Sequence, residues 1–152
     1  MKTKLYRLSG LLLISLQSSL PLHAAGDMTQ QQAITVKVKL GNTDNALRFY
    51  PDHLRFETGK LYKLVITNPS PQKHYFIATG LSHAVFTRKV QLLDKTHNTI
   101  AEVKGIINEI EVYPNGISEW WFVPVKTLSS TTMHCSISGH AKAGMTGRIT
   151  IK

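Results

Sequence analysis

One short stretch near the C-terminus contains three side chains of the kinds that bind soft metals. Cys135 is the only cysteine in the chain, His140 follows five residues later, and Met145 follows five residues after that. A thiolate, an imidazole and a thioether together suit a soft, redox-active metal such as copper. Gly139 and Gly144 directly precede two of these residues, where a loop that wraps around a metal must bend sharply. The stretch therefore predicts a metal-binding loop.

The predicted loop is followed by a β-strand and lacks one ligand. Residues 148–152 alternate polar and apolar side chains, which is typical of a strand. A single cysteine is often only a small buried hydrophobic residue, but three soft ligands on one glycine-containing loop favour a metal. A blue-copper site combines one cysteine, two histidines and a weak axial methionine. The second histidine must come from elsewhere, and the candidates are His53, His74, His83, His97 and His134.

Residues 135–145, CSISGHAKAGM, together with the strand that follows, resemble the copper loop of the cupredoxins, which are single-domain blue copper proteins. The resemblance implies one type 1 copper per chain, held by Cys135, His140 and Met145. In cupredoxins the remaining histidine begins a strand shortly after an asparagine-containing turn. Residues 68–76, NPSPQKHYF, are similar to that pattern, so the resemblance assigns the role to His74. His83 is the reserve candidate.

Two further expectations concern the surroundings of the sulfur. Backbone N–H groups around Ser136 and Asn68 are expected to donate hydrogen bonds to the Cys135 sulfur and thereby to influence the reduction potential. His134 adjoins the cysteine on a strand and is expected to face away from the metal. The chain departs from the usual cupredoxin pattern at Tyr75, where a small polar residue is common.

Short segments with period-two alternation indicate an all-β fold. The expected strands include residues 34–40, 61–67, 74–78, 106–112 and 120–123, with Gly, Pro and Asn turns between them. Residues 81–93 are ambiguous: Phe86, Val90 and Leu93 have helical spacing, but the segment could equally be an irregular excursion. The pattern predicts an antiparallel sandwich or barrel. The resemblance implies a cupredoxin-like Greek-key β-sandwich over residues 34–152, with a short helix in the 81–93 region.

The N-terminal segment, residues 1–24, has the features of a secretory signal peptide. Three basic residues precede a short apolar run, and Ala24 and Ala25 supply small residues for cleavage. We therefore expect an exported, periplasmic or otherwise extracytoplasmic, protein with no membrane span after cleavage. The segment contains three of the 18 basic residues and none of the nine acidic ones, so the mature chain of 128 residues would have a net charge of +6. This charge suits an acidic partner, and no nucleic-acid-binding motif is present.

The ligand set favours a one-electron carrier that exchanges electrons with a cytochrome, an oxidase or a reductase, and we expect a monomer and not an enzyme. The alternative on the same fold is a copper protein for storage, delivery or resistance, although the chain has no Met/His-rich tract. A multicopper oxidase would need additional His-x-His pairs, which the sequence lacks. A Cys–His nucleophile would leave Met145 unexplained, and zinc would make poor use of the methionine.

Overall fold

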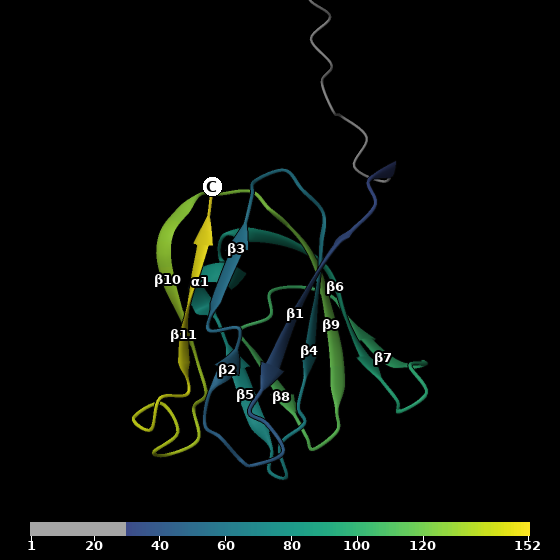
Figure 1. Cartoon of the computed structure of the whole chain (residues 1–152). Helices are drawn as coiled ribbons and strands as arrows, with labels where there is room; N and C mark the ends of the chain where they lie inside the picture. Colours follow the sequence, from purple (N-terminus) through teal and green to yellow (C-terminus); the bar gives the residue numbers. More distant parts are fainter. Residues whose placement is uncertain (1–29) are drawn as a thin grey trace, which may run out of the picture.

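The computed structural model describes residues 30–152, which form a sandwich of two β-sheets (Figure 1). The predicted signal peptide, residues 1–24, lies outside the described residues. In chain order the elements are β1 (Ile34–Leu40), β2 (Phe49–Tyr50), β3 (His53–Phe56), β4 (Tyr62–Thr67), β5 (His74–Ile77), α1 (Thr79–Ser82), β6 (Val85–Leu93), β7 (Thr99–Val103), β8 (Glu109–Val112), β9 (Ile117–Pro124), β10 (Leu128–His134) and β11 (Thr146–Ile151).

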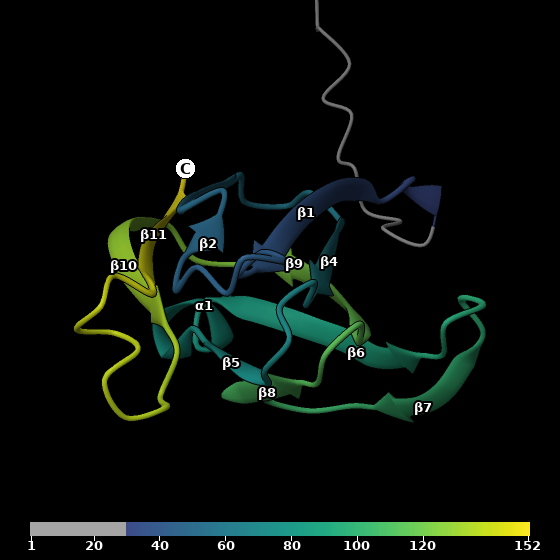
Figure 2. The ribbon, with the colours of Figure 1, turned by 60° about the horizontal axis from the view of Figure 1, so that its bottom comes forward.

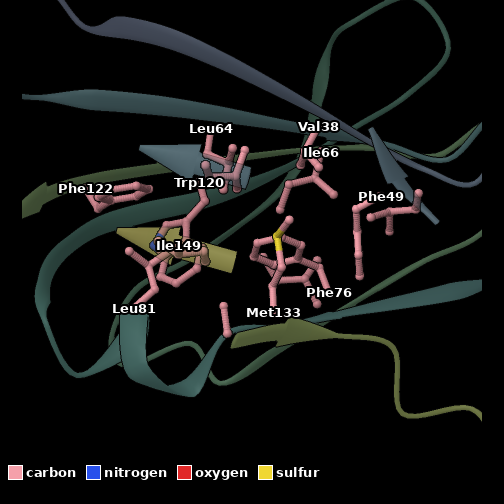
Figure 3. Close-up of a cluster of buried hydrophobic side chains, with 14 of the residues drawn as sticks. Val38, Phe49, Leu64, Ile66, Phe76, Leu81, Trp120, Phe122, Met133 and Ile149 are labelled. Atoms are coloured by element: carbon pink, nitrogen blue, oxygen red, sulfur yellow. The ribbon is translucent and has the colours of Figure 1, made fainter. Parts of the chain in front are cut away.

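The strands pair in an order that brings distant segments together. One sheet has the order β2-β1-β4-β9-β6-β7 and the other β3-β11-β10-β5-β8. Alternating strand residues from both sheets point into a shared core (Figure 3), including Leu64 and Trp120 from the first sheet and Phe76 and Ile149 from the second. The sandwich predicted from the alternation is therefore confirmed, and its strands are mixed in direction.

Two strand pairs differ from the antiparallel arrangement that we expected. β1 pairs with β4 in parallel, and β3 pairs with β11 in parallel. Each parallel pair needs a crossover between its strands, since a tight hairpin can join only antiparallel neighbours. For β3 and β11 this crossover includes most of the chain, so the C-terminal strand lies beside an early strand (Figure 1).

The ambiguous segment 81–93 is mainly a strand. A single helical turn, α1, ends at Ser82, and β6 then runs for nine residues beside β9. The register shifts between Thr87 and Lys89, which marks a β-bulge. A bulge adds one residue and so exchanges the faces of the strand, which leaves Phe86 63% exposed although Val90 is buried. The helical spacing of these side chains is thus produced by a broken strand alternation.

The loop that connects β10 to β11 projects from one end of the sandwich, and the short strands β2 and β5 lie nearby (Figures 1 and 2). This loop contains residues 135–145, and β5 begins with His74. Of the helices in the described residues, none has the length and apolar character needed to span a membrane.

Candidate metal centre

Three of the residues singled out in the sequence meet in the interior. The Nδ1 atom of His140 lies 3.5 Å from the Sγ atom of Cys135, and the Nδ1 atom of His74 lies 3.9 Å from the same sulfur. One ligand atom from each residue lies within 4.8 Å of the other two. All three residues are buried, and His140 is the most exposed of them, at 8%. The fold thus brings two imidazoles next to one thiol.

The donor spacing fits a shared metal ion. Imidazole and thiolate ligands bind a metal at about 2.0–2.3 Å, so three donors in a trigonal plane lie about 3.5–4 Å apart. Both sulfur-to-nitrogen distances fall in this interval. Burial, and after it the nearby His140, lowers the pKa of His74 to about 4, so its imidazole is neutral and has a free lone pair near neutral pH. Metal binding requires this form of histidine.

Local hydrogen bonds hold the turn that precedes His74. The Nδ2 group of Asn68 donates to the carbonyl oxygens of Gln72 and Val112, at 2.8 and 2.7 Å. Its Oδ1 atom accepts from the N–H group of Ser70 at 2.9 Å, which is the turn that asparagine side chains favour. The alternation of β5 then directs His74 and Phe76 inward. The Asn-Pro-Ser-Pro segment thus determines where the strand with His74 begins.

The loop with the other two predicted ligands is closed by backbone hydrogen bonds. Cys135 N–H donates to the Met145 carbonyl oxygen at 3.2 Å, and Met145 N–H donates to the His140 carbonyl oxygen at 2.9 Å. Gly139 and Gly144 have φ values of +84° and +108°, which other residues rarely adopt. The side chain of Met145 is fully buried in the core cluster that includes Cys135. The loop is therefore compact, with its two ends joined by a backbone hydrogen bond between Cys135 and Met145.

The remaining histidines lie away from this group. His83 and His97 are exposed, and the imidazole of His53 contacts Thr150 and Arg148. His134 is half-buried at the end of β10, opposite Ile77 and Thr146. Of the five histidines considered for the ligand outside the loop, His74 is the one that lies next to Cys135.

The donor to the sulfur differs from the one that we expected. The N–H group of Asn68 donates to the Gly116 carbonyl oxygen at 3.1 Å, so that part of the prediction is wrong. Within the described residues the N–H group that reaches the Cys135 sulfur is that of Tyr75, at 3.4 Å. Sequence reasoning missed this contact because it treated Tyr75 only as an unusual side chain. Its backbone makes the interaction.

The side chain of Tyr75 anchors this N–H group to the neighbouring strand. Tyr75 lies opposite Glu111 in the β5–β8 pair, and its hydroxyl donates to the Glu111 carboxylate at 2.9 Å. Lys73 forms an ion pair with the same carboxylate at 2.8 Å and lies 5.7 Å from the centre of the Tyr75 ring. These contacts lower the pKa of Glu111, with the hydrogen bond from Lys73 as the largest cause. The network ties the residue next to His74 to the surface of β8.

Gly41 closes the side of the centre next to His74. It is buried, it has a φ of +74°, and an ideal Cβ atom placed on it would lie 3.2 Å from the Nε2 atom of His74. That nitrogen is fully buried and has no hydrogen-bond partner. The backbone of the loop after β1 therefore packs directly against the imidazole. The sequence predicts turns between the expected strands over residues 34–40 and 61–67, but nothing in it indicates that Gly41 contacts the centre.

Comparison with known proteins gives structural neighbours but no match in sequence. No family model and no curated protein sequence matches the chain. Auracyanin A, a "blue" copper protein from Chloroflexus aurantiacus, superposes with a TM-score of 0.51 over 80% of this chain and 100% of that chain, at 16% identity. An auracyanin from Roseiflexus castenholzii superposes with a TM-score of 0.50 over 80% and 99%, at 18% identity. The chain has the cupredoxin fold.

This cupredoxin fold also occurs within larger proteins. A multicopper oxidase from Pediococcus acidilactici superposes with a TM-score of 0.60 at 20% identity, covering 96% of this chain. The chain spans only 31% of that oxidase, and the same share of one from Campylobacter jejuni. At these identities the comparison establishes the fold. The buried His74–Cys135–His140 group fits a single type 1 copper.

Proposed function

We propose that the chain carries single electrons between redox proteins, and that the Nδ1 atoms of His74 and His140, the sulfur of Cys135 and, more weakly, the thioether of Met145 would hold one copper ion. The observation that carries this proposal is the convergence of two imidazole nitrogens on one buried sulfur, at 3.5 and 3.9 Å. When bound by such a ligand set, copper would supply a one-electron Cu(I)/Cu(II) couple.

The protein supplies a rigid, water-poor environment for this chemistry. Cys135, His74 and Met145 are essentially inaccessible to water. The N–H group of Tyr75 is placed to stabilise the negative charge of the thiolate. The hydrogen bonds that close the 135–145 loop keep Cys135, His140 and Met145 in one arrangement. A fixed ligand geometry limits the rearrangement that accompanies each change of oxidation state.

The arrangement supports a carrier over the two alternatives. A storage or delivery protein needs ligands that an acceptor can reach. Of His74, Cys135 and His140, the most exposed is His140, at only 8%, so an acceptor has little access to the ligands. A multicopper oxidase needs several metal sites, and within residues 30–152 one group of three such ligands occurs. The predicted signal peptide, residues 1–24, supports an exported protein, and N-terminal sequencing of the secreted chain tests it.

Copper titration of the metal-free mature protein tests the function. We expect one equivalent of Cu(II) to produce an intense blue colour that a mild reductant bleaches. Cys135→Ser and His74→Ala should lose the colour, because each removes a donor of the trigonal set. His83→Ala is the matched control and should remain blue, since His83 is exposed.

Two results would contradict the proposal. A colourless Cu(II) protein, or a preparation that contains only zinc, would remove the blue-copper assignment. Rapid transfer of Cu(I) to an acceptor protein, together with slow electron exchange at an electrode, would favour copper delivery instead.

A further inference from the structure

Three of the four arginines in the described residues lie on one face of the molecule. Arg48 directly precedes β2, Arg55 lies on β3 and Arg148 lies on β11. β3 and β11 are neighbours, with Arg148 opposite His53 and Thr150 opposite Arg55. All three arginines are exposed, whereas the residue that follows each of them along the chain is buried (Phe49, Phe56 and Ile149). We call Arg48, Arg55 and Arg148 the arginine face; β2, β3 and β11 lie together in Figure 1.

These arginines lack carboxylate partners within the described residues. All five ion pairs there join a lysine to a glutamate, and none includes an arginine. A guanidinium nitrogen of Arg148 instead lies 3.2 Å from the Nδ1 atom of His53. Partial burial, followed by the charges of Arg148 and Arg55, lowers the pKa of His53. The face therefore keeps an excess of positive charge, with Asp52 as the nearby carboxylate but no ion pair to any of the three arginines.

Two open depressions extend from this face to the end of the 135–145 loop. One, of about 270 Å³, is lined by Arg48 and by Gly144 of the 135–145 loop. The other, of about 440 Å³, is lined by Arg148 and His53. Asp52 and Thr146 line both depressions, and Thr146 directly follows Met145. A molecule seated on the arginine face would thus contact the loop that holds three of the four proposed ligands.

We propose that the arginine face is the docking surface for an acidic, one-electron redox protein. Guanidinium groups recognise carboxylates through paired hydrogen bonds, and unpaired surface cations also accelerate the approach of an acidic partner. Asp52 lines one depression with Arg48 and the other with Arg148. Its carboxylate would repel a uniformly anionic polymer or lipid surface, but it can pair with a lysine among the carboxylates of a protein. The proposal rests on the proposed function, and the exchange moves one electron between the two proteins and no atoms.

Cytochrome b5, an acidic haem protein, serves as the probe. The test variant Arg48→Gln/Arg148→Gln is compared with the control Arg88→Gln/Lys95→Gln, which removes the same charge from exposed positions in and after β6. Binding is followed by NMR shifts, which do not require electron exchange, and the rate by stopped-flow absorption. We expect the test variant to bind more weakly and to exchange electrons about tenfold more slowly than the control at low salt. Unchanged melting temperatures establish that both variants fold, and Arg48→Gln against Arg88→Gln replaces the pair if Arg148→Gln does not fold.

The outcomes separate this proposal from the proposed function. Equal binding and equal rates in the two variants would overturn the docking surface, even if electron exchange remained fast. Binding that depends on the arginine face without any electron exchange would support the surface and refute the carrier. Binding to phosphatidylserine vesicles that depends on the arginine face, with unchanged binding of cytochrome b5, would overturn the proposal in favour of a membrane site.

Discussion

Replacement of Gly41 by alanine should disturb the candidate metal centre more than its position in a turn would suggest. The new Cβ atom would lie 3.0 Å from the Cβ atom of Ser70, 3.1 Å from the carbonyl oxygen of Ala46 and 3.2 Å from the Nε2 atom of His74. Ordinary contacts of this kind begin at about 3.4 Å, so at least one neighbour must move. Because Ser70 and His74 are both buried, the imidazole cannot move away without disturbing the core.

Gly59 provides a matched control for the backbone contribution. Its φ is also +74°, but an added Cβ atom would have no neighbour within 4 Å. A left-handed conformation costs a non-glycine residue roughly 1–2 kcal/mol, and this cost applies to both variants. Overpacking of a well-filled site adds about 1–3 kcal/mol. We therefore expect Gly41→Ala to lower the free energy of unfolding by about 1–3 kcal/mol more than Gly59→Ala does.

Urea unfolding of the metal-free variants measures this difference, and the visible spectrum of the copper-loaded forms locates it. We expect a shifted absorption band in Gly41→Ala and an unchanged band in Gly59→Ala, because only the first alters the position of an imidazole donor. Equal losses of stability in the two variants would refute the packing argument. A greater loss in Gly41→Ala with an unchanged band would mean that Ser70 or Ala46 moves and that His74 does not.

Three further predictions concern the axial residue, the buried imidazole and the strand after the loop. Met145→Leu should retain a blue copper site with a raised reduction potential in voltammetry, since leucine nearly conserves the buried volume but donates nothing to Cu(II); loss of the metal would contradict a merely tuning role. The metal-free protein should lose stability as the pH falls from about 6.5 towards about 4, because His74 takes up a proton in the unfolded chain but not in the folded state. Urea unfolding at several pH values measures this loss, and the part that His74 contributes should be absent in His74→Gln. Gly147→Ala should lower the free energy of unfolding by about 3 kcal/mol or more in the same assay, since its Cβ atom would lie 2.6 Å from the backbone oxygen of Asp52. A loss of stability no greater than that of Gly59→Ala would refute this prediction.

Much of the sandwich could be predicted because its strands bury one face. β1 coincides with the predicted strand over residues 34–40, and β4 and β5 lie within one residue of the predicted bounds. β7 was not predicted, because all five of its residues are exposed and its sequence has no alternation of apolar and polar residues. β6 was misread because its bulge reverses the alternation in mid-strand. Period-two patterns report burial, so strands without a buried face, or with an interrupted one, leave no such pattern.

The centre was predictable where its residues share a segment and less so where distant segments meet. The loop from Cys135 to Met145 is recognisable from its own side chains, whereas the choice of His74 rested on the resemblance of residues 68–76 to the cupredoxin pattern. Contacts made by the backbone carry no such information. Any residue except proline could supply the N–H group at position 75, and many turns contain a glycine such as Gly41. Their roles follow from which segments the fold brings next to His74 and Cys135.

The pairing of β5 explains why a backbone group reaches the sulfur at all. β5 is paired along its whole length with β8, but it meets β10 only where Ile77 lies opposite His134. Beyond that point β10 ends and the chain turns into the 135–145 loop, so the N–H group of Tyr75 faces Cys135 and not the carbonyl oxygen of another strand residue. The sulfur accepts the hydrogen bond that a continued β10 would have received. The hydrogen bond to the sulfur is therefore supplied by the backbone of the sheet, and of all residues at position 75 proline alone would remove its donor.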